Sequence, residues 1–386
     1  MGRRLNVLAL EPWYGGSHRR FLDGLARYSA HDVRVVGMTA RFWKWRMQGG
    51  AVTLAGKARE VLDAGWVPDV LFASDMVNLP AFLALTRPHF GETPAVLFFH
   101  ENQLTYPLRP GDARDYTYAY VNYLSSLAAD RIAFNSAFHE GEFFGALPDL
   151  LRRFPDYTHL ETLAQLRAKS SVCHLGLDLA GLDRTRAEIQ ALKAHDGGPP
   201  VILWNHRWEH DRRPEVFFRV INRLDDAGLR FRLILAGERF EEQPPEFEDG
   251  FRRYAERVLH YGFAESFDDY ARLLHRADVV VSTSVHEFFG VAMMEAIHCG
   301  CHPLLPDRLT YPELVPPNLH RPLLHAPVLY RDEEELFTLL RGLLTGAEKP
   351  LPSAVLRDVA APFAWPAQAP HYDALFEEAA VLTPGG

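Results

Sequence analysis

The chain has 386 residues, of which 47% are hydrophobic and 24% charged, and its formal net charge is −9. Because single hydrophobic cores stop growing at about 250–300 residues, this length predicts two domains. The negative charge excludes a protein coated in positive charge for gripping nucleic acid non-specifically, but it leaves room for a local basic groove.

Short apolar runs alternate with helix-length segments in the first half of the chain. A buried strand is predicted at residues 6–10. It is followed by a turn at Gly15-Gly16-Ser17, in which Ser17 is the candidate cap of a helix over residues 18–28. The strand signal repeats at residues 33–37, 70–73, 95–99, 131–134 and 170–177. This β-α-β alternation implies a parallel sheet with helices on both faces.

A break at residues 197–200 (Gly-Gly-Pro-Pro) precedes a second series of the same kind. Strands are predicted at residues 201–204, 231–236, 258–261, 279–283 and 302–305. Helices are predicted to begin near Pro214, Phe247, Phe267 and Gly290, and a last helix is predicted over residues 365–380.

The predicted fold class is therefore α/β, with two Rossmann-like, doubly wound domains facing a central cleft. We place the N-terminal domain at residues 1–185 and the C-terminal domain at residues 186–386, with the last helix a candidate to pack back on the N-terminal domain. In such sheets ligands bind at the carboxyl ends of the strands, so the chemistry should lie in loops that directly follow strands.

The most specific of these loops follows the strand predicted at residues 279–283. It carries Glu287, and a helix opens near Gly290 with Glu295 further along it. Free N–H groups and partial positive charge at a helix N-terminus suit a phosphate, and a glycine lets a ligand approach the backbone closely. The alternative is an amphipathic helix with two solvated glutamates.

Two glutamates with seven residues between them and Phe289-Gly290 inside resemble the motif of retaining GT-B glycosyltransferases. The resemblance implies that Glu295 holds the nucleotide ribose and that Glu287 lies near the donor sugar. Phe289, Gly290 and Val291 then belong to the donor site.

A second loop, residues 205–213, follows the strand predicted at residues 201–204 and contains Arg207 and Arg212. Arginines there can neutralise a diphosphate through forked hydrogen bonds, which matters because a departing nucleoside diphosphate gains negative charge. The same GT-B enzymes have an arginine and a lysine five positions apart here, so Arg212 replaces the usual lysine. The alternative, a solvated basic turn, would leave Trp204 and Trp208 exposed.

Two loops of the first domain carry dense polar residues. His100 follows a buried strand, and the resemblance to GT-B enzymes puts it at the reaction centre. Gly15 and Gly16 follow the first strand and are expected beside the phosphates. We expect the other polar residues of these loops to bind the acceptor: Tyr14, Ser17, His18, Glu101, Asn102 and Gln103. The alternatives are a structural histidine and a plain glycine turn.

Four blocks together are similar to the tRNA-queuosine α-mannosyltransferase family, namely residues 11–18, 100–103, 205–211 and 289–291. The resemblance implies transfer of mannose from GDP-mannose, with retention, to queuosine in a tRNA anticodon. It also implies that leaving-group departure and acceptor attack occur on the same face of the sugar. Composition and spacing do not indicate mannose, guanine or tRNA independently.

One segment suits an RNA acceptor, Arg41-Phe42-Trp43-Lys44-Trp45-Arg46. Basic and aromatic residues interleave there, as expected where phosphates are neutralised and bases stack. We single out Trp43, Lys44 and Arg46 as candidate acceptor contacts. A helix edge that packs two tryptophans into the core is the alternative.

Neither a metal nor another resident cofactor is expected, and GDP-mannose is a co-substrate. His298-Cys299-Gly300-Cys301-His302 has ligand types for zinc, but these residues are too close together for the usual spacings. The three cysteines are too few for a disulfide scaffold. With no signal-peptide pattern and no membrane-length apolar run, the expected location is the cytoplasm, without membrane or DNA partners.

Two alternatives to this function stay open. One keeps the fold but changes the acceptor to a small molecule, a lipid or a protein. The other is a nucleotide-sugar-binding or RNA-binding module that has no catalytic activity.

Overall fold

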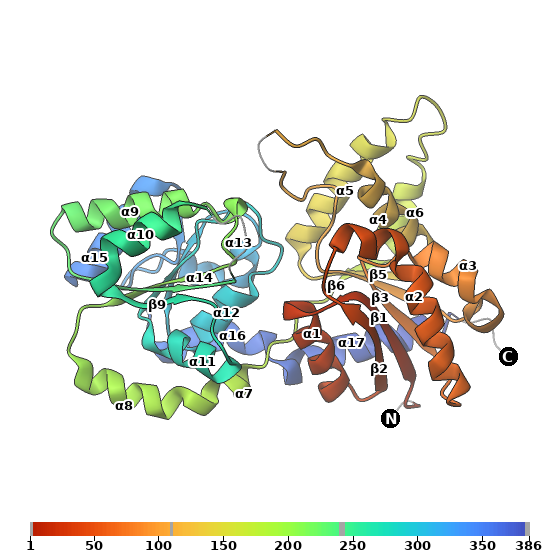
Figure 1. The fold of residues 1–386 in the computed structure, drawn as a ribbon, viewed down its shortest axis with the longest axis horizontal. Helices are drawn as coiled ribbons and strands as arrows, with labels where there is room; N and C mark the ends of the chain where they lie inside the picture. The colour runs from red at the N-terminus through yellow and green to blue at the C-terminus, as the bar shows by residue number, and fades with distance from the viewer. Residues whose placement is uncertain (1–2, 109–110, 239–243, 383–386) are drawn as a thin grey trace. The chain divides into compact units, whose positions relative to one another are not determined.

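The computed structural model describes residues 3–108, 111–238 and 244–382. Contacts divide the chain into two compact units (Figure 1), one formed by Met1–Gly176 with Trp365–Gly386 and the other by Leu177–Ala364. The division thus falls after Gly176, before residue 185 where the sequence analysis placed the boundary, and the end of the chain belongs to the first unit.

The first unit contains a six-stranded parallel sheet with the order β2-β1-β3-β4-β5-β6. Its strands are β1 (Asn6–Tyr14), β2 (Asp32–Thr39), β3 (Val70–Ser74), β4 (Ala95–Phe99), β5 (Arg131–Phe134) and β6 (Ser170–Val172). Its helices are α1 (Gly16–Tyr28), α2 (Trp43–Asp63), α3 (Leu79–Phe90), α4 (Tyr116–Ala128), α5 (Ala137–Leu151), α6 (Thr162–Ala168) and α17 (Trp365–Ala380).

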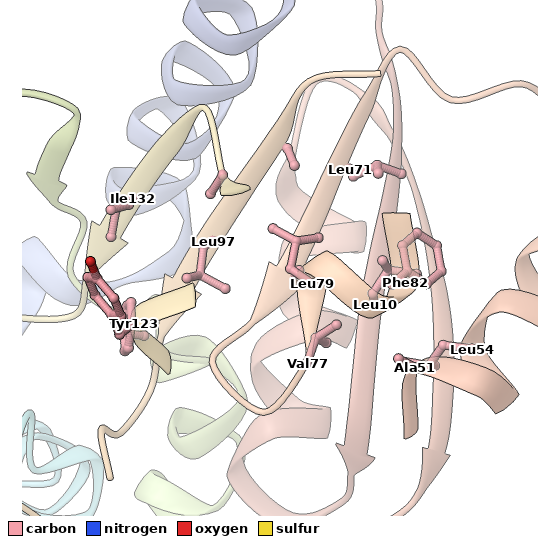
Figure 2. Close-up of a cluster of buried hydrophobic side chains, with 14 of the residues drawn as sticks. Leu10, Ala51, Leu54, Leu71, Val77, Leu79, Phe82, Leu97, Tyr123 and Ile132 are labelled. Atoms are coloured by element: carbon pink, nitrogen blue, oxygen red, sulfur yellow. The ribbon is translucent and has the colours of Figure 1, made fainter. Parts of the chain in front are cut away.

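Both faces of this sheet are buried at its centre, which explains why the central strands β3 and β4 are continuous apolar runs. Alternate residues such as Leu10, Leu71 and Leu97 point to one face, where they pack against side chains of α2 and α3 such as Leu54 and Phe82 (Figure 2). Each of these residues is at most 1% exposed.

The other face is covered by α1 and α17 (Figure 1). Tyr372 of α17 stands edge-on to Phe72 of β3 with ring centroids 6.4 Å apart, and Trp365 lies 5.5 Å from Phe21 of α1. A Cβ on Gly24 would lie 2.0 Å from the Trp365 indole nitrogen, so α1 needs a glycine there. The last helix of the chain thus completes the core of the first unit.

The second unit contains a six-stranded parallel sheet with the order β12-β11-β10-β7-β8-β9. Its strands are β7 (Val201–Asn205), β8 (Arg232–Ala236), β9 (Val258–Gly262), β10 (Val279–Val281), β11 (His302–Pro306) and β12 (Leu329–Tyr330). Its helices of eight residues or more are α8 (Arg186–Asp196), α9 (Pro214–Asp226), α10 (Glu246–Tyr254), α11 (Phe267–Arg276), α12 (Val291–His298), α15 (Glu333–Thr345) and α16 (Ser353–Ala360). The shorter ones are α7 (Leu179–Leu182), η1 (Asp183–Thr185), η2 (His210–Arg212), η3 (Ala255–Arg257), α13 (Tyr311–Leu314), α14 (Pro317–His320) and η4 (Ala361–Phe363).

The predicted α/β alternation is confirmed, with four local differences. β1 continues to Tyr14, so residues 11–14, which were predicted to lie in a loop, belong to the strand. The helix after β1 begins at Gly16, and its cap residue is Gly15 rather than Ser17. β6 ends at Val172, because the chain then leaves the sheet and Leu177 pairs with Ala364 instead. β12 was not predicted, because two residues are too short to give a periodic pattern.

Each sheet has one place where the strand order reverses, between β1 and β3 in the first unit and between β7 and β10 in the second. Loops at such switch points diverge to opposite faces of the sheet and leave room for a ligand. The predicted polar loops after β1, β7 and β10 all begin at these two points.

No helix within residues 3–108, 111–238 and 244–382 combines the length and the apolar character that crossing a bilayer would require.

Candidate active site

The loops after β7 and β10 are fastened to each other by their backbones. The Val285 N–H donates to the Asp211 carbonyl at 2.9 Å. The Thr283 hydroxyl lies 2.7 Å from the carbonyl oxygen of Arg212 and 3.0 Å from that of Arg213. The two loops that carry the predicted donor residues are therefore one structure at the switch point.

Arg212 is the centre of this structure. Its guanidinium is 8% exposed and donates through Nη1 to the His286 carbonyl at 2.6 Å and to Glu287 Oε2 at 2.9 Å. Burial lowers the pKa of Arg212, but the negative charges of Glu287 and Asp211 outweigh burial and raise it overall. Arg212 is thus a fixed positive charge, and it sets the position of Glu287.

Arg207, by contrast, is 39% exposed and lies 3.4 Å from Glu209 Oε2. Burial and the two arginines lower the pKa of His206 well below its usual value, and for the same reasons that of His286 falls to about 3. Because both imidazoles are neutral, the positive charge at this loop pair comes from arginines, and of these Arg213 is paired with Glu215.

Helix α12 begins where the motif predicted a helix. Gly290 caps it with φ = 89° and ψ = 46°, in the left-handed region where residues with a Cβ are strained. A Cβ there would lie 3.1 Å from the Tyr311 ring. Val291 opens the helix, while the Phe289 side chain is buried and stands edge-on to Phe363, with 5.4 Å between ring centroids. Phe289 can therefore offer a ligand only its backbone.

Glu295, on the same helix, is only 4% exposed. The Tyr270 hydroxyl donates to Glu295 Oε2 at 2.7 Å, and the Asn205 side-chain amide donates to that hydroxyl at 2.9 Å. The carboxylate is thereby held in one orientation near the start of α12.

In the first unit, the ends of β1, β3 and β4 bring together two histidines and two buried carboxylates. Glu11 Oε2 lies 3.0 Å from His18 Nδ1, and the ring centroids of His18 and His100 are 4.2 Å apart. Asp75 Oδ1 accepts from the His100 backbone N–H at 2.9 Å. The structure therefore puts His18 and His100, predicted from separate motifs, in direct contact.

The residues after His100 have different environments. Asn102 is fully buried, and its Oδ1 accepts the backbone N–H groups of Leu104 and Thr105, both at 3.0 Å. Glu101 and Gln103 are half-buried, and the Gln103 N–H donates to Asn122 Oδ1 at 2.9 Å. Asn102 therefore shapes this loop, while Glu101 and Gln103 remain partly accessible.

At the end of β1 and the start of α1, some residues are packed and others are exposed. The Tyr14 hydroxyl donates to Asp23, and burial together with that carboxylate raises the Tyr14 pKa. A Cβ on Gly15 would come within 2.5 Å of the Ala40 Cβ, so this glycine permits close packing. Gly16 and Ser17 are exposed at the start of α1.

The segment of residues 41–46, which we call the basic-aromatic segment, lies at the start of α2. Trp43 is 37% exposed and Trp45 is 64% exposed, so the alternative that packs both tryptophans into the core is wrong. Trp43 lies 5.0 Å from the Tyr118 ring of α4, and Lys44 Nζ is 5.6 Å from the Trp43 ring centroid. Arg46 Nε donates to the Thr39 carbonyl at 3.2 Å.

Two clusters have ligand types that suit a metal. The first is the His298–His302 segment, whose side chains contact different groups. His298 contacts Asp183, Cys301 contacts the Leu274 carbonyl, and His302 accepts from the Leu351 N–H. Within the described ranges, one group offers three ligand atoms within 4.8 Å of one another, namely Glu11, His18 and His100. The hydrogen bond between Glu11 and His18 already joins two of these atoms.

Asp75, Tyr270 and the carboxylate of Glu11 were missed by the sequence analysis as site residues. Asp75 directly follows a fully buried strand, which is the signal that drew attention to His100 and would have found it too. Tyr270 lies on an amphipathic helix, and nothing local distinguishes it from a packing residue.

Two family models match successive parts of the chain and meet between residues 177 and 185, close to the division after Gly176 that the contacts give. The family model described as tRNA-queuosine alpha-mannosyltransferase N-terminal matches residues 6–177, and that of glycosyl transferases group 1 matches residues 185–328. A tRNA-queuosine alpha-mannosyltransferase of Drosophila melanogaster is 33% identical over 81% of this chain and 82% of its own length. A GDP-mannose-dependent alpha-(1-6)-phosphatidylinositol dimannoside mannosyltransferase of Mycobacterium tuberculosis is 25% identical over 77% of this chain and 78% of its own length.

Solved structures resemble the whole chain at lower identity. HepE of Anabaena, in complex with UDP and glucose, has a TM-score of 0.66 at 15% identity over 97% of this chain and all of its own. Sucrose-phosphate synthase of Thermosynechococcus elongatus has a TM-score of 0.72 at 16% identity over 97% of this chain and 99% of its own. These likenesses, with the two parallel six-stranded sheets, confirm the GT-B fold.

Proposed function

This chain belongs to the tRNA-queuosine α-mannosyltransferase family, and from that premise we propose how its residues carry mannose from GDP-mannose to queuosine in tRNA. It is a glycosyltransferase. The observation that carries the donor assignment is the pairing of buried Arg212 with Glu287 beside the start of α12.

The donor diphosphate is bound by Arg207 and Arg212 in this proposal. Arg212 is fixed before the ligand arrives, so its charge needs no reorganisation when the leaving GDP becomes more negative. Arg207 is exposed enough to close on the phosphates. The N–H groups at Gly290 and Val291 add the partial positive charge of the helix start. Two arginines and a helix end neutralise the diphosphate without a metal.

The sugars of the donor are assigned to the two glutamates. Glu295 accepts hydrogen bonds from the ribose hydroxyls, with Tyr270 and Asn205 keeping its carboxylate in place. Glu287, held by Arg212, faces the mannose. We assign Gly15 and Gly16 to phosphate contacts in this proposal.

His100 belongs at the reaction centre in this proposal. Its neutral imidazole can exchange hydrogen bonds with a sugar hydroxyl without opposing the positive charge that develops on the sugar. Retention follows if GDP departs and the queuosine hydroxyl attacks on the same face, and a diphosphate oxygen accepts the proton.

The acceptor contacts are the basic-aromatic segment and the polar loop residues. Trp43 offers an exposed ring on which a base can stack, and Lys44 and Arg46 offer charges for phosphates. Tyr14, Ser17, Glu101 and Gln103 are the side chains that remain accessible near the strand ends. Because the acceptor is a tRNA, we propose a cytoplasmic location.

Radiolabelled GDP-mannose supplied with tRNA that contains or lacks queuosine tests this function. Label should enter only the queuosine-containing tRNA. An Arg207→Ala variant should lose about 10²–10³-fold in kcat, which is the usual cost of one transition-state donor. Arg252→Ala, at an exposed arginine of α10 in the same unit, is the matched control.

Label that enters both tRNA pools would contradict queuosine as the acceptor. GDP-mannose binding or hydrolysis with no label in either pool would support the donor site and refute tRNA as the acceptor. A small molecule, lipid or protein that accepts label after ribonuclease treatment would identify the alternative acceptor class.

A further inference from the structure

The environment of His100 contains a charged pair that the proposed chemistry does not yet use. We infer that the buried Glu11 and the mostly buried His18, whose side chain is 14% exposed, form an ion pair that holds the His100 ring in place, and that Asp75 anchors the His100 backbone. These three are positioning residues, and the inference rests on the proposed role of His100 at the reaction centre.

The topology explains why these residues meet. β1, β3 and β4 are neighbours in the sheet and run parallel, so their carboxyl ends lie side by side. Glu11 is on the last part of β1, Asp75 directly follows β3, and His100 directly follows β4. They surround the switch point of the first unit.

The Glu11 carboxylate is fully buried, and a buried carboxylate is costly unless it is paired and hydrogen-bonded. Its Oε1 accepts from the Trp13 N–H at 2.8 Å, and its Oε2 faces His18 Nδ1 at 3.0 Å. Burial lowers the pKa of His18, but the charge and hydrogen bond of Glu11, with smaller contributions from the charges of Asp75 and Glu101, outweigh burial and raise the pKa to about 9. His18 is therefore a cation at neutral pH.

This cation lies against His100. The two rings are tilted by 33° with centroids 4.2 Å apart, and Phe21 and Phe98 stand edge-on to His100 at 4.9 and 4.8 Å. Burial, His18 and His139 lower the pKa of His100 well below its usual value. The ring is thus enclosed by three neighbours, one of them charged, and is kept neutral.

The backbone of His100 is held from both sides. Asp75 Oδ1 accepts its N–H at 2.9 Å and that of Glu101 at 3.4 Å. The Asn135 amide donates to its carbonyl at 3.0 Å, and the Asn122 amide donates to the Asp75 carbonyl at 2.9 Å. Neither the ring nor the backbone of His100 can turn without breaking one of these contacts.

A Glu11→Gln variant tests the pair, since it removes the charge while keeping the shape. In histidine-labelled protein, NMR should show one imidazole that titrates near pH 9 and is absent from His18→Gln. In Glu11→Gln this titration should move below about pH 7, near an ordinary histidine. The titration reports on the pair even if the protein has no activity on tRNA.

Kinetics test the positioning role. In Glu11→Gln, kcat should fall about tenfold to a hundredfold, because small displacements of a reacting group are costly, while the KM for each substrate stays within about threefold. The alkaline limb that His18 contributes to the pH–rate profile should move from about pH 9 towards neutrality, since His18 loses its proton earlier. Asp75, whose pKa burial raises to about 8, titrates in the same range, so the shift is read against His18→Gln, which lacks the His18 limb and retains that of Asp75. Glu92→Gln, at an exposed position of the same unit, is the matched control.

A Glu11→Gln/His18→Gln variant leaves no charged group of the pair and serves if the single variant unfolds. Full kcat in either folded variant, or an unchanged His18 titration in Glu11→Gln, would overturn the inference. Stoichiometric divalent metal in the purified protein, lost in Glu11→Gln, would overturn it in favour of a metal site. A wild-type protein with the pH 9 titration but no transfer would refute the proposed function and retain the pair.

Discussion

Two arginines five positions apart have different burial, and that difference separates their contributions. Arg212 is buried and bound to Glu287 and the His286 carbonyl, whereas Arg207 is half-exposed. Arg212 should therefore contribute both to the stability of the fold and to donor binding, whereas Arg207 should contribute mainly to donor binding.

Arg212→Ala should lower the free energy of unfolding by about 3 kcal/mol. This value is at the lower end of the range for breaking a buried ion pair, because Glu287 remains partly exposed to solvent. Arg207→Ala should change it by less than about 0.5 kcal/mol. Urea unfolding measures both, and calorimetry with GDP should show weaker binding in each variant. Equal stability losses would contradict the division of roles.

Gly290→Ala should destabilise the protein and weaken donor binding. The left-handed conformation costs a residue with a Cβ about 1–2 kcal/mol, and the Cβ would also press on Tyr311 at 3.1 Å. Gly346→Ala is the matched control, because Gly346 has φ = 74° with nothing within 4 Å of its Cβ position. If only strain matters, both variants will lose the same stability and GDP will bind normally.

At the scale of elements, the aromatic rings at the start of α2 are exposed, although the body of the helix packs on the sheet through residues such as Ala51 and Leu54. Phe42 caps the helix with φ = 55°, in the left-handed region. An exposed, strained and basic helix start is better suited to contact a ligand than to stabilise the fold.

Replacing Trp43, Lys44 and Arg46 by alanine should weaken tRNA binding and leave GDP binding intact. The magnitude of the slope of log K for tRNA binding against log salt should be smaller in the variant by about 1.4, which corresponds to the loss of two phosphate contacts on single-stranded RNA. Lys57→Ala/Arg59→Ala removes the same charges from a later part of the helix and is the control. Unchanged tRNA affinity in the folded triple variant would exclude this segment from the interface.

At the scale of the whole chain, the first unit, whose residues are synthesised first, is completed only by α17, the last helix. Truncation after Ala364 removes α17 and exposes the sheet face that contains Phe72 and Phe98. Hydrogen exchange should then show loss of protection across the first unit while the second unit stays protected. Glu378→Ala, at an exposed residue of α17, should leave both protected.

Buried neutral histidines should set the acid limit of stability. The pKa of His302 is lowered to about 4 and that of His286 to about 3, mainly by burial. Between pH 6.5 and these values the unfolded chain binds more protons than the folded one, so stability falls as pH falls. Urea unfolding at pH 7.5, 6, 5 and 4 measures this slope, and His302→Gln should reduce it. Asp75, whose pKa burial raises to about 8, acts in the opposite direction over part of this range, so the comparison with His302→Gln is the test. Equal slopes in wild type and His302→Gln would contradict the assignment.

The sequence alone determined the position of most strands, because two-sided burial in a parallel sheet requires uninterrupted apolar runs such as residues 95–99 and 201–204. It also determined the donor motif, because strand, loop, glycine and helix are contiguous there. The family blocks at residues 100–103 and 205–211 likewise lie within single loops.

Tertiary structure decided what depends on residues distant in the chain. The pairing of Glu11 with His18 against His100, and the anchoring by Asp75, arise only because β1, β3 and β4 are neighbours. The exposure of Trp43 and the return of α17 to the first unit were likewise undecided by local pattern. Periodicity specifies which face of a helix or strand is buried, but strand order and packing determine which partner covers that face.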